Sequence, residues 1–311
     1  VYRLKMIKLD NNIKNRKVVD MANDTLTYNI NPKINAAWGK KMLELYHHGS
    51  SVCAAKVRMY MYEKNLEWKG HYLDILAGDQ FDPQYMKLNP KAVVPTLVHN
   101  DNVICDSTVI CEYIEDEFQE HPLRPKNSLE HAKVLYWTKA VDEELHPACG
   151  ALTFLCCHRH IVLRLGEEGV EKFLDSTPVL SVTANWHEAK KEIVRYGFEA
   201  SGASEKVKLY DLYLHKMEEV LLDRKWLAGE NFTFADIALT PYVNRLDMLD
   251  LSGMWENQRL PRVAEWFSLI KERPSFKPSF LDWCPEDLTN DLKNFGSQSW
   301  PEVAQILKIS H

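Results

Sequence analysis

Between residues 42 and 118 the spacing of hydrophobic and polar positions changes several times, and each change marks a new element. Alternating apolar residues predict a strand from Met42 to His48, and apolar positions near helical period predict a helix from Ser51 to Asn65. The same patterns predict a strand at Leu66–Asp74, a short helix at Pro83–Leu88, strands around Thr96–His99 and Val103–Cys105, and a helix at Ser107–Phe118. The predicted unit therefore alternates strands and helices and ends with two strands and a helix.

That order is thioredoxin-like and indicates an α/β domain over residues 42–120. A proline-punctuated segment at residues 121–127 is typical of a linker, and after it helical periodicity dominates. We therefore expect an all-α domain over residues 128–311. Within it, Thr233 followed three positions later by Asp236 has the pattern of a capping box, which predicts that a buried helix begins there.

Residues 1–41 are rich in Asn and Lys and contain only scattered apolar positions. The sequence begins with Val, and the first convincing strand begins at Met42. We interpret residues 1–41 as an appended or upstream-translated extension, non-native or disordered, with Met42 as the native start.

Composition places the chain among ordinary globular proteins, with 45% hydrophobic and 26% charged residues. The net charge is −6, and no basic stripe interleaved with aromatic residues is present, which argues against a nucleic-acid partner. No apolar run reaches the roughly 18 residues that cross a bilayer, so we expect no membrane association and a cytoplasmic location. Seven cysteines without C-x-x-C spacing predict reduced thiols, and the paired histidines lack the spaced partners of a metal site.

Two short motifs predict a binding site. Pro95 has no N–H group for a sheet ladder and favours an extended Val94, whose backbone is then free to pair with a peptide. Asp106 and Ser107 stand where a helix begins, and free N–H groups there together with a hydroxyl suit a carboxylate. The alternative, that Asp106 and Ser107 only cap the helix, is compatible with this role. Together the motifs predict a site for a small thiol peptide.

These features together resemble cytosolic glutathione transferases. The resemblance is carried by V-P-T-L at Val94–Leu97, D-S-T at Asp106–Thr108 and the capping box at Thr233–Asp236, in that order. The motif G-D-Q-F-x-x-x-Y-x-x-L-N-P at Gly78–Pro90 makes it more specific. The similarity spans about residues 42 to 275 and implies a thioredoxin-like domain followed by an all-α domain.

A narrower resemblance concerns the class of enzyme. The segment Ser50–Arg58 is similar to the serine-type theta and zeta classes. The segments Ser107–Phe118, Trp137–Glu143 and Thr177–Phe198 are similar to bacterial glutathione-dependent β-etherases, which cleave lignin-type aryl ethers. The residues after Pro274 match no part of the family pattern.

The resemblance implies that the protein activates glutathione, its co-substrate, at the start of the first helix. An alkyl thiol has a pKa of about 8.5 to 9, and a hydroxyl at the positive end of a helix can lower it by roughly 1 to 2 units. We expect Ser51 to supply that hydroxyl, with Ser50 and then Cys53 as alternatives. The competing interpretation is that Ser51 only caps the helix.

Further glutathione contacts follow from the same resemblance. Val94 would pair with the cysteinyl part of the tripeptide if the Val94–Pro95 peptide bond is cis. Ser107 would hold the γ-glutamyl carboxylate, with Asp106 opposing its amine. Gln80 would face the glycyl carboxylate, and Lys91 either adds positive charge there or is a solvated loop lysine.

The electrophile is expected against the helical domain. Tyr136, His146, Cys149 and Phe154 follow the linker and would line the cleft, and the alternative for each of them is core packing. The implied function is detoxification-type transfer of glutathione to a hydrophobic, aromatic electrophile, with β-aryl ether cleavage as the reaction. The alternatives are a glutathione-dependent isomerase or dehalogenase and a non-enzymatic interaction module of the same fold. The resemblance also implies a homodimer through the flank of the thioredoxin-like domain and the helix after the linker.

Overall fold

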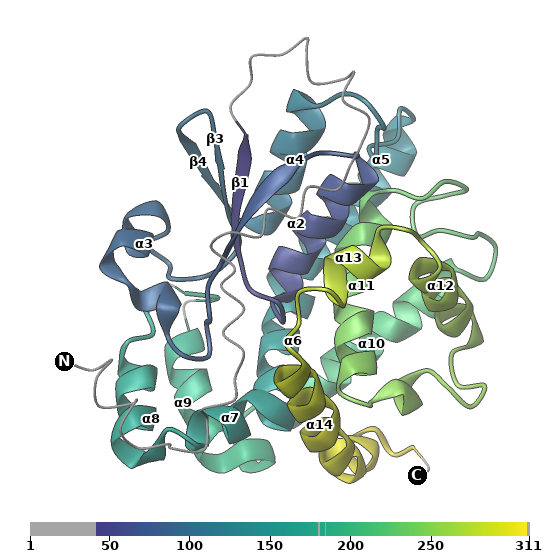
Figure 1. The fold of residues 1–311 in the computed structure, drawn as a ribbon. Helices are drawn as coiled ribbons and strands as arrows, with labels where there is room; N and C mark the ends of the chain where they lie inside the picture. The colour runs from purple at the N-terminus through teal and green to yellow at the C-terminus, as the bar shows by residue number, and fades with distance from the viewer. Residues whose placement is uncertain (1–41, 180, 184, 310–311) are drawn as a thin grey trace. The chain divides into compact units, whose positions relative to one another are not determined.

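Four strands form a mixed sheet at the start of the described chain (Figure 1). The structure, a computed structural model, describes residues 42–179, 181–183 and 185–309, so the predicted extension at residues 1–41 lies outside them. The strands are β1 (Leu43–His47), β2 (Trp68–Tyr72), β3 (Thr96–His99) and β4 (Asn102–Cys105). β1 lies between a parallel β2 and an antiparallel β3, and β4 pairs with β3 at the edge.

Three helices complete this domain. They are α2 (Val52–Glu63), α3 (Pro83–Leu88) and α4 (Ser107–Glu117). The elements that the hydrophobic pattern predicts are therefore confirmed, with ends that differ by at most two residues. A single 3₁₀ turn at Asp79–Phe81, between β2 and α3, was not predicted.

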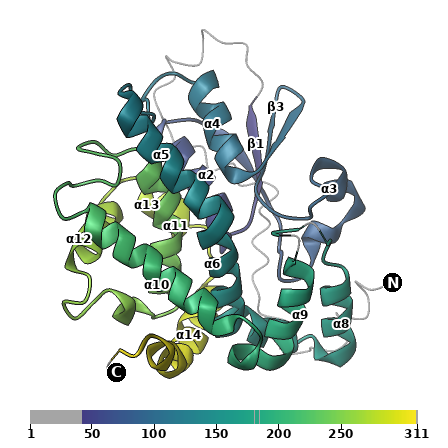
Figure 2. The ribbon, with the colours of Figure 1, turned by 180° about the vertical axis from the view of Figure 1, so that it is seen from behind.

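The remainder of the described chain is helical, which confirms the predicted all-α class. Figure 2 shows α5 and α6 as parts of one long run, whose members are α5 (Ser128–Ala140), a π-helical turn (Val141–Leu145), α6 (His146–Thr153), a second π-helical turn (Phe154–His158) and α7 (Arg159–Leu163). The later helices are α8 (Gly166–Asp175), α9 (Trp186–Tyr196), α10 (Ala203–Val220), α11 (Phe234–Met248), α12 (Pro261–Lys271), α13 (Phe276–Phe280) and α14 (Glu286–Leu307). The short 3₁₀ turns Gly197–Glu199 and Ser252–Met254 lie between them.

Helix α2 is central to the fold because it packs against α4, α11 and α13. Ala54, Val57 and Met59 are fully buried on it, and a helix that is apolar on most sides belongs in an interior. Lys56 is buried as well, and its Nζ lies 3.2 Å from Asp142 Oδ1 in the first π-helical turn and 2.9 Å from the Thr108 hydroxyl. This ion pair joins the helix that follows the predicted catalytic serines to the all-α domain.

The predicted capping box at the start of α11 is confirmed. The Thr233 side chain accepts a hydrogen bond from the Ala235 N–H, and Asp236 accepts one from the Thr233 N–H at 3.0 Å. Asp236 is fully buried and also accepts bonds from the Leu227 N–H and the Trp266 indole. The carboxylate therefore ties the start of α11 to α12 and to the segment before it.

The residues after Pro274, which the family pattern left unassigned, form α13 and α14, and α13 and the segment that follows it pack against the first domain. The Trp283 ring lies 4.5 Å from the His47 ring, centroid to centroid. The backbone of Trp283 occupies the place where a Cβ at Gly49 would be, so only glycine fits there. Arg58 Nε donates to the Ser279 carbonyl at 2.8 Å. Helix α13 and the segment after it therefore support the loop that leads from β1 into α2.

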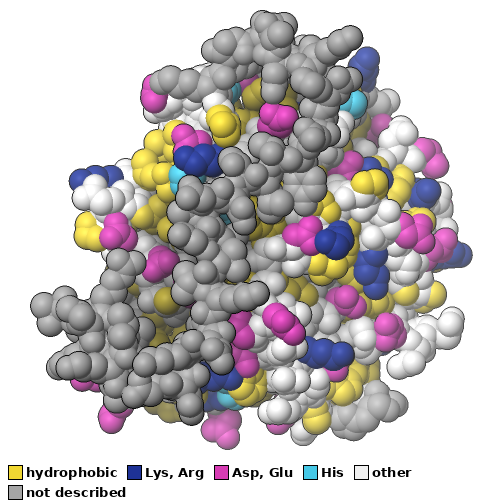
Figure 3. All heavy atoms as spheres, in the orientation of Figure 1, with side chains coloured by type: hydrophobic (Ala, Val, Ile, Leu, Met, Phe, Trp, Pro, Cys, Tyr) yellow, Lys and Arg dark blue, Asp and Glu magenta, His cyan; other side chains and the backbone are white. Residues whose placement is uncertain are grey.

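No helix within the described ranges is long and apolar enough to cross a membrane. On the part of the face in Figure 3 that the described residues form, acidic and basic side chains are interspersed rather than gathered into a patch of one sign.

Candidate functional site

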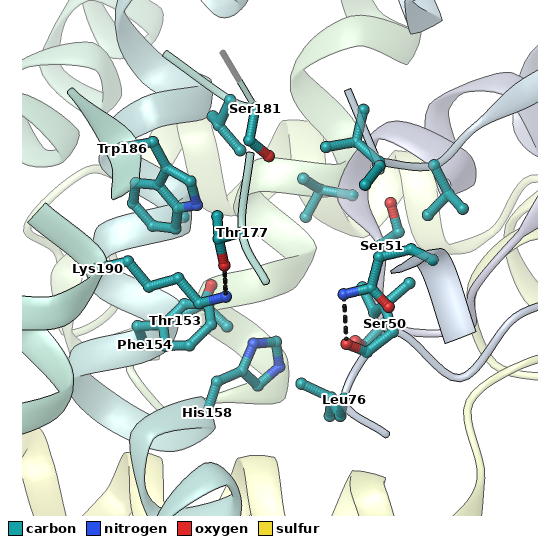
Figure 4. A pocket seen from close by; sticks show the side chains of 18 of the residues that line it. Ser50, Ser51, Leu76, Thr153, Phe154, His158, Thr177, Ser181, Trp186 and Lys190 are labelled. Atoms are coloured by element: carbon teal, nitrogen blue, oxygen red, sulfur yellow. Dashed lines mark hydrogen bonds between the residues drawn. The ribbon is translucent and has the colours of Figure 1, made fainter. Parts of the chain in front are cut away.

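A pocket opens where the sheet domain meets the helices of the second domain (Figure 4). On the sheet-domain side it is lined by residues of the loops after β1 and β2 and of the segment before Pro95: Ser50, Ser51, Val52, Ile75, Leu76, Gln80, Phe81, Ala92, Val93 and Val94. On the helical side it is lined by residues of α6, the second π-helical turn, α8, α9, α11 and the segment between α8 and α9, among them His146, Cys149, Phe154, His158, Phe173, Thr177, Trp186, Lys190 and Arg245.

Ser51 stands at the N-cap of α2 and lines the pocket. Its Oγ accepts a hydrogen bond from the Ala54 N–H at 3.2 Å. A serine hydroxyl has one proton to donate besides its acceptor positions, so capping leaves that proton available to a ligand. The cap role and the predicted thiol role are therefore compatible in one side chain.

Ser50 has a different environment. It is buried, and both its N–H and its hydroxyl oxygen lie within 3.2 Å of His48 Nδ1. Burial, together with the charges of Arg58 and Arg245, lowers the pKa of His48 to about 3, so the imidazole is neutral at neutral pH. Because the backbone N–H can only donate, Nδ1 is the unprotonated nitrogen and the Ser50 hydroxyl donates to it. The hydroxyl proton of Ser50 is therefore engaged in this hydrogen bond to His48.

Cys53 lies one turn further along α2 and does not line the pocket, although it faces a residue that does. Its Sγ is 3.5 Å from His146 Nδ1 and 3.7 Å from Nε2. Burial by itself would raise the pKa of this thiol, but the charge and hydrogen bond of His146, helped by Lys56 and Ser107, bring it down to about 7. Burial by itself would lower the pKa of His146, but the charge and hydrogen bond of Cys53, helped by Asp142, raise it. The two side chains form a coupled thiol–imidazole dyad beside the pocket, in which each group favours the charged form of the other.

The predicted glutathione contacts divide into two groups. Val94 lines the pocket, and the Val94–Pro95 bond is cis, as the resemblance implies. Gln80 lines it too, with its amide nitrogen donating to the Ile75 carbonyl at 3.0 Å. The other predicted contacts are not among the lining residues of the pocket: Lys91, Pro95, Asp106 and Ser107.

Asp106 and Ser107 form the start of α4. Asp106 has φ 74° and accepts a hydrogen bond from the Thr108 N–H at 3.2 Å, so it is the N-cap of this helix. Ser107 is buried, and its side chain helps to lower the pKa of the Cys53 thiol. The structure therefore places Ser107 beside Cys53, behind the serine end of the pocket.

The predicted electrophile residues are only partly brought together. His146, Cys149 and Phe154 line the pocket, whereas Tyr136 on α5 is 54% exposed and lies outside the lining. Sequence reasoning missed most of the aromatic wall, which consists of Phe81, Phe173 and Trp186 together with Phe154. Trp186 belongs to the segment that carries the β-etherase resemblance, and this was the only sequence signal pointing to it.

Two buried cations in the pocket were also missed. Lys190 on α9 donates to the Thr177 hydroxyl at 2.9 Å and lies over the Phe173 ring. Arg245 on α11 donates from Nη2 to the Ser50 carbonyl, and its Nε and Nη1 have no acceptor among the described residues. Lys190 lies within the Thr177–Phe198 segment of the β-etherase resemblance, but nothing in the sequence singled out either residue.

Solved structures and other known proteins resemble this chain over most of its length. Protein LigF of Sphingobium sp. (strain NBRC 103272 / SYK-6) is 29% identical over 79% of this chain and 96% of its own length. The tetrachloro-p-hydroquinone reductive dehalogenase of Sphingobium chlorophenolicum is 27% identical over 76% of this chain and 94% of its own. The crystal structure of the β-etherase LigF superposes with a TM-score of 0.70 at 26% identity, covering 77% of this chain and 98% of that one.

The family comparison agrees with the geometry of the pocket. Residues 50–117 match the glutathione S-transferase N-terminal domain, and residues 181–274 match the glutathione S-transferase C-terminal domain. The first match begins at the serine pair and includes the cis-proline segment, and the second includes Lys190 and Arg245. Together they span more than half of the chain, which therefore belongs to the glutathione S-transferase family of enzymes, whose co-substrate is glutathione.

Proposed function

We propose that this protein activates the glutathione thiol with Ser51 and directs the thiolate at an aromatic electrophile, with cleavage of a β-aryl ether as the reaction. The observation that carries the proposal is the pocket itself. It holds a hydroxyl with a free proton at the start of α2, the backbone of Val94, and an aromatic wall on the opposite side.

Glutathione is proposed to lie along the sheet-domain side of the pocket. The Val94 backbone would pair with the cysteinyl residue, which brings the thiol toward Ser51 and the positive end of α2. Gln80 would face the glycyl carboxylate. Arg245 supports this placement, because its guanidinium bonds the Ser50 carbonyl and adds positive charge at the serine end. The Ser51 hydroxyl, the positive end of α2 and Arg245 favour the thiolate over the thiol, whereas Val94 and Gln80 would position the peptide.

The chemistry is a nucleophilic substitution. The thiol loses its proton to solvent, the thiolate sulfur forms a bond to the carbon that carries the aryloxy group, and the carbon–oxygen bond breaks. The electron pair leaves on the aryl oxygen, which becomes a phenolate and takes up a proton. The products are a glutathione thioether and a phenol, so atoms and charge balance and no oxidant is needed.

The aromatic wall and the likeness to LigF support an aryl ether as the substrate. Rings of Phe154 and Trp186 lie 5.8 Å apart and those of Phe81 and Phe173 lie 5.9 Å apart, both at edge-to-face angles, so the helical side of the pocket offers an aromatic surface to a flat ligand. The likeness to a reductive dehalogenase favours a second candidate, glutathione-dependent dehalogenation or isomerisation, and the Cys53–His146 dyad beside the pocket is the observation that supports it.

The first experiment is the Ser51→Ala variant. Loss of the hydroxyl removes the hydrogen bond to the thiolate, so turnover should fall about 10- to 100-fold at neutral pH while the Kd for glutathione stays near its original value. Turnover is measured with an aryl ether bearing a chromogenic phenol, and the thiol pKa in the complex by absorbance near 240 nm. Ser50→Ala is the matched control and should retain most activity.

Product analysis separates the candidate reactions. Substitution yields one glutathione thioether for each phenol released, whereas isomerisation returns glutathione unchanged and reductive dehalogenation yields oxidised glutathione. A protein that binds glutathione and turns over none of these substrates would be an interaction module. Unchanged turnover in Ser51→Ala, with loss in Cys53→Ala, would move the proposed role from Ser51 to the dyad.

A further inference from the structure

The pocket carries positive charge that the described protein does not balance. Its lining includes Lys190 and Arg245 and no Asp or Glu. Lys190 is only 4% exposed and Arg245 only 3%. A buried charge without a partner costs free energy, so an unbalanced pair of cations at a binding site calls for negative charge from a ligand.

The two cations face different parts of the pocket. Arg245 bonds the carbonyl of Ser50 and therefore belongs to the serine end. Figure 4 shows Lys190 and Thr177 on the opposite wall from Ser50 and Ser51, beside Phe154 and Trp186. Glutathione bound on the sheet-domain side would supply the negative charge that Arg245 needs. Lys190 faces the part of the pocket in which the electrophile is proposed to bind.

The other buried lysines of this chain show how a structural lysine is satisfied. Lys56 lies 3.2 Å from Asp142 and Lys64 lies 2.8 Å from Glu115. Lys190 has only the Thr177 hydroxyl as a hydrogen-bond acceptor among the described residues, and an ammonium has three protons to donate. Burial alone lowers its pKa, to about 7, with no carboxylate counteracting it.

We propose that Lys190 is a specificity-determining residue that binds a carboxylate on the aromatic electrophile, so that the preferred substrates are aryl carboxylates rather than neutral arenes. The inference rests on the proposed function. The ammonium lies 3.9 Å from the centroid of Phe173 and 5.4 Å from that of Phe154, so an anion at Lys190 sits at the edge of an aromatic slot. A ring in that slot and its carboxylate at the ammonium are therefore held by adjacent groups.

The experiment compares two glutathione conjugates that differ only in charge. S-(4-carboxybenzyl)glutathione and its amide, S-(4-carbamoylbenzyl)glutathione, have nearly the same shape, and calorimetry gives the Kd of each together with that of glutathione. The wild-type protein should bind the carboxylate about 10-fold or more tightly than the amide, because a hydrogen bond to a charged partner is among the stronger ones.

Variants assign the preference to one side chain. Lys190→Met should abolish the preference for the carboxylate and leave glutathione binding unchanged, and Lys190→Arg should keep a preference for the anion. Lys191→Met is the matched control, because Lys191 is the next residue on α9 and pairs with Asp175 outside the pocket. It should behave like the wild-type protein.

Equal affinity of the wild-type protein for the two conjugates overturns the inference, and so does a preference that survives in Lys190→Met. If glutathione itself does not bind, the proposed function fails, and the pair phenoxyacetate and phenoxyacetamide then decides the inference alone. Tighter binding of phenoxyacetate that is lost only in Lys190→Met supports a carboxylate site, and no such difference overturns it.

Discussion

At the start of α2, Ser50, Ser51 and Cys53 differ in which of their hydrogen-bonding atoms are already used. The Ser50 hydroxyl donates to His48, the Ser51 oxygen accepts from the backbone and keeps its proton, and the Cys53 sulfur is paired with His146. A ligand thiolate needs a donor with a free proton. This requirement favours Ser51 as the residue that contacts the glutathione thiol. The ionisation of the Cys53 thiol is a separate event that can be measured by itself.

The Cys53 thiol is expected to titrate with a midpoint near pH 7. Burial is the largest single influence on this pKa and raises it, and the charge and hydrogen bond of His146 are the main influences that lower it, so His146→Gln should move the midpoint up by about one unit or more, toward an ordinary thiol. The pH dependence of iodoacetamide modification, read by mass spectrometry of the Cys53 peptide, measures it. Unmodified Cys156, which is fully buried, serves as the internal control, and an unchanged midpoint in His146→Gln would refute the dyad.

Lys190 should make the protein less stable than it would be with an apolar side chain. Replacing a buried unpaired cation by Lys190→Met is expected to raise the free energy of unfolding at pH 6 by about 1 to 4 kcal/mol. The folded-state pKa of about 7 lies below the unfolded value near 10.4, so the unfolded state binds more protons between these values and the wild-type protein gains stability there as pH rises.

Urea unfolding of both proteins at pH 6 and pH 9.5 measures this effect. The free energy of unfolding of Lys190→Met should exceed that of the wild-type protein by the full amount at pH 6 and by a smaller amount at pH 9.5. For Lys191→Met, the difference in free energy of unfolding from the wild-type protein should not change with pH. If the difference in free energy of unfolding between Lys190→Met and wild type is the same at both pH values, Lys190 is not a buried cation that lacks a carboxylate partner.

Sequence reasoning found the pocket residues beside the serine and proline motifs, and on the helices it found only part of the lining, namely His146, Cys149 and Phe154. Ser51, Gln80 and Val94 lie in loops whose chemistry is local, and all of them line the pocket. Lys190 and Arg245 lie within α9 and α11, where the packing of the helix decides which way a side chain points. A lysine on an amphipathic helix is typical of a solvated face, so nothing local distinguished Lys190.

At the scale of elements, the sheet and its helices follow directly from the hydrophobic pattern, whereas the long helical run does not. Its two π-helical turns, Val141–Leu145 and Phe154–His158, each widen the helix locally and shift the angular position of every residue that follows. Residues on either side of such a turn therefore do not share the faces that a regular period assigns. Tyr136 precedes the first turn and is exposed, and His146 follows it and lines the pocket.

The capping box of α11 should contribute more through Asp236 than through Thr233. Thr233→Ala removes a helix cap and is expected to lower the free energy of unfolding by about 1 kcal/mol. Asp236→Ala leaves the Leu227 N–H and the Trp266 indole without their shared acceptor and should cost about 3 kcal/mol or more. Urea unfolding compares the two, and equal losses would show that the contacts beyond the cap contribute nothing.

For the whole molecule, the elements that the resemblance assigns to a dimer carry exposed apolar side chains. They lie on β4, α4 and α5, namely Val103, Val109, Leu129, Leu135 and Tyr136. We propose that these surfaces form the homodimer that the family resemblance implies, in which a second copy would cover the exposed apolar side chains. Tyr136 belongs to this set. The proposal therefore gives it a place at the dimer interface instead of the substrate contact that its sequence position suggested.

The double variant Val109→Glu with Tyr136→Glu is expected to be monomeric. Two buried carboxylates at an apolar interface cannot be paired, so light scattering should give about the 36.1 kDa of a single chain, against twice that for the wild-type protein. Leu222→Glu is the control, because Leu222 is 64% exposed and lies beyond the end of α10, on none of these elements. A wild-type monomer would contradict the proposal.

The contact between Gly49 and the backbone of Trp283 limits how modular this enzyme can be. The glutathione S-transferase domains end at residue 274, yet the loop that carries Ser50 and Ser51 rests on a segment beyond that point. If residues 42–120 of this chain were placed in a relative that lacks this segment, the loop that carries the serines would lose the backbone contact with Trp283. In a chimera, the loop that carries Ser50 and Ser51 must therefore be transferred together with α13 and the segment that holds Trp283, although most of the chain separates them in sequence.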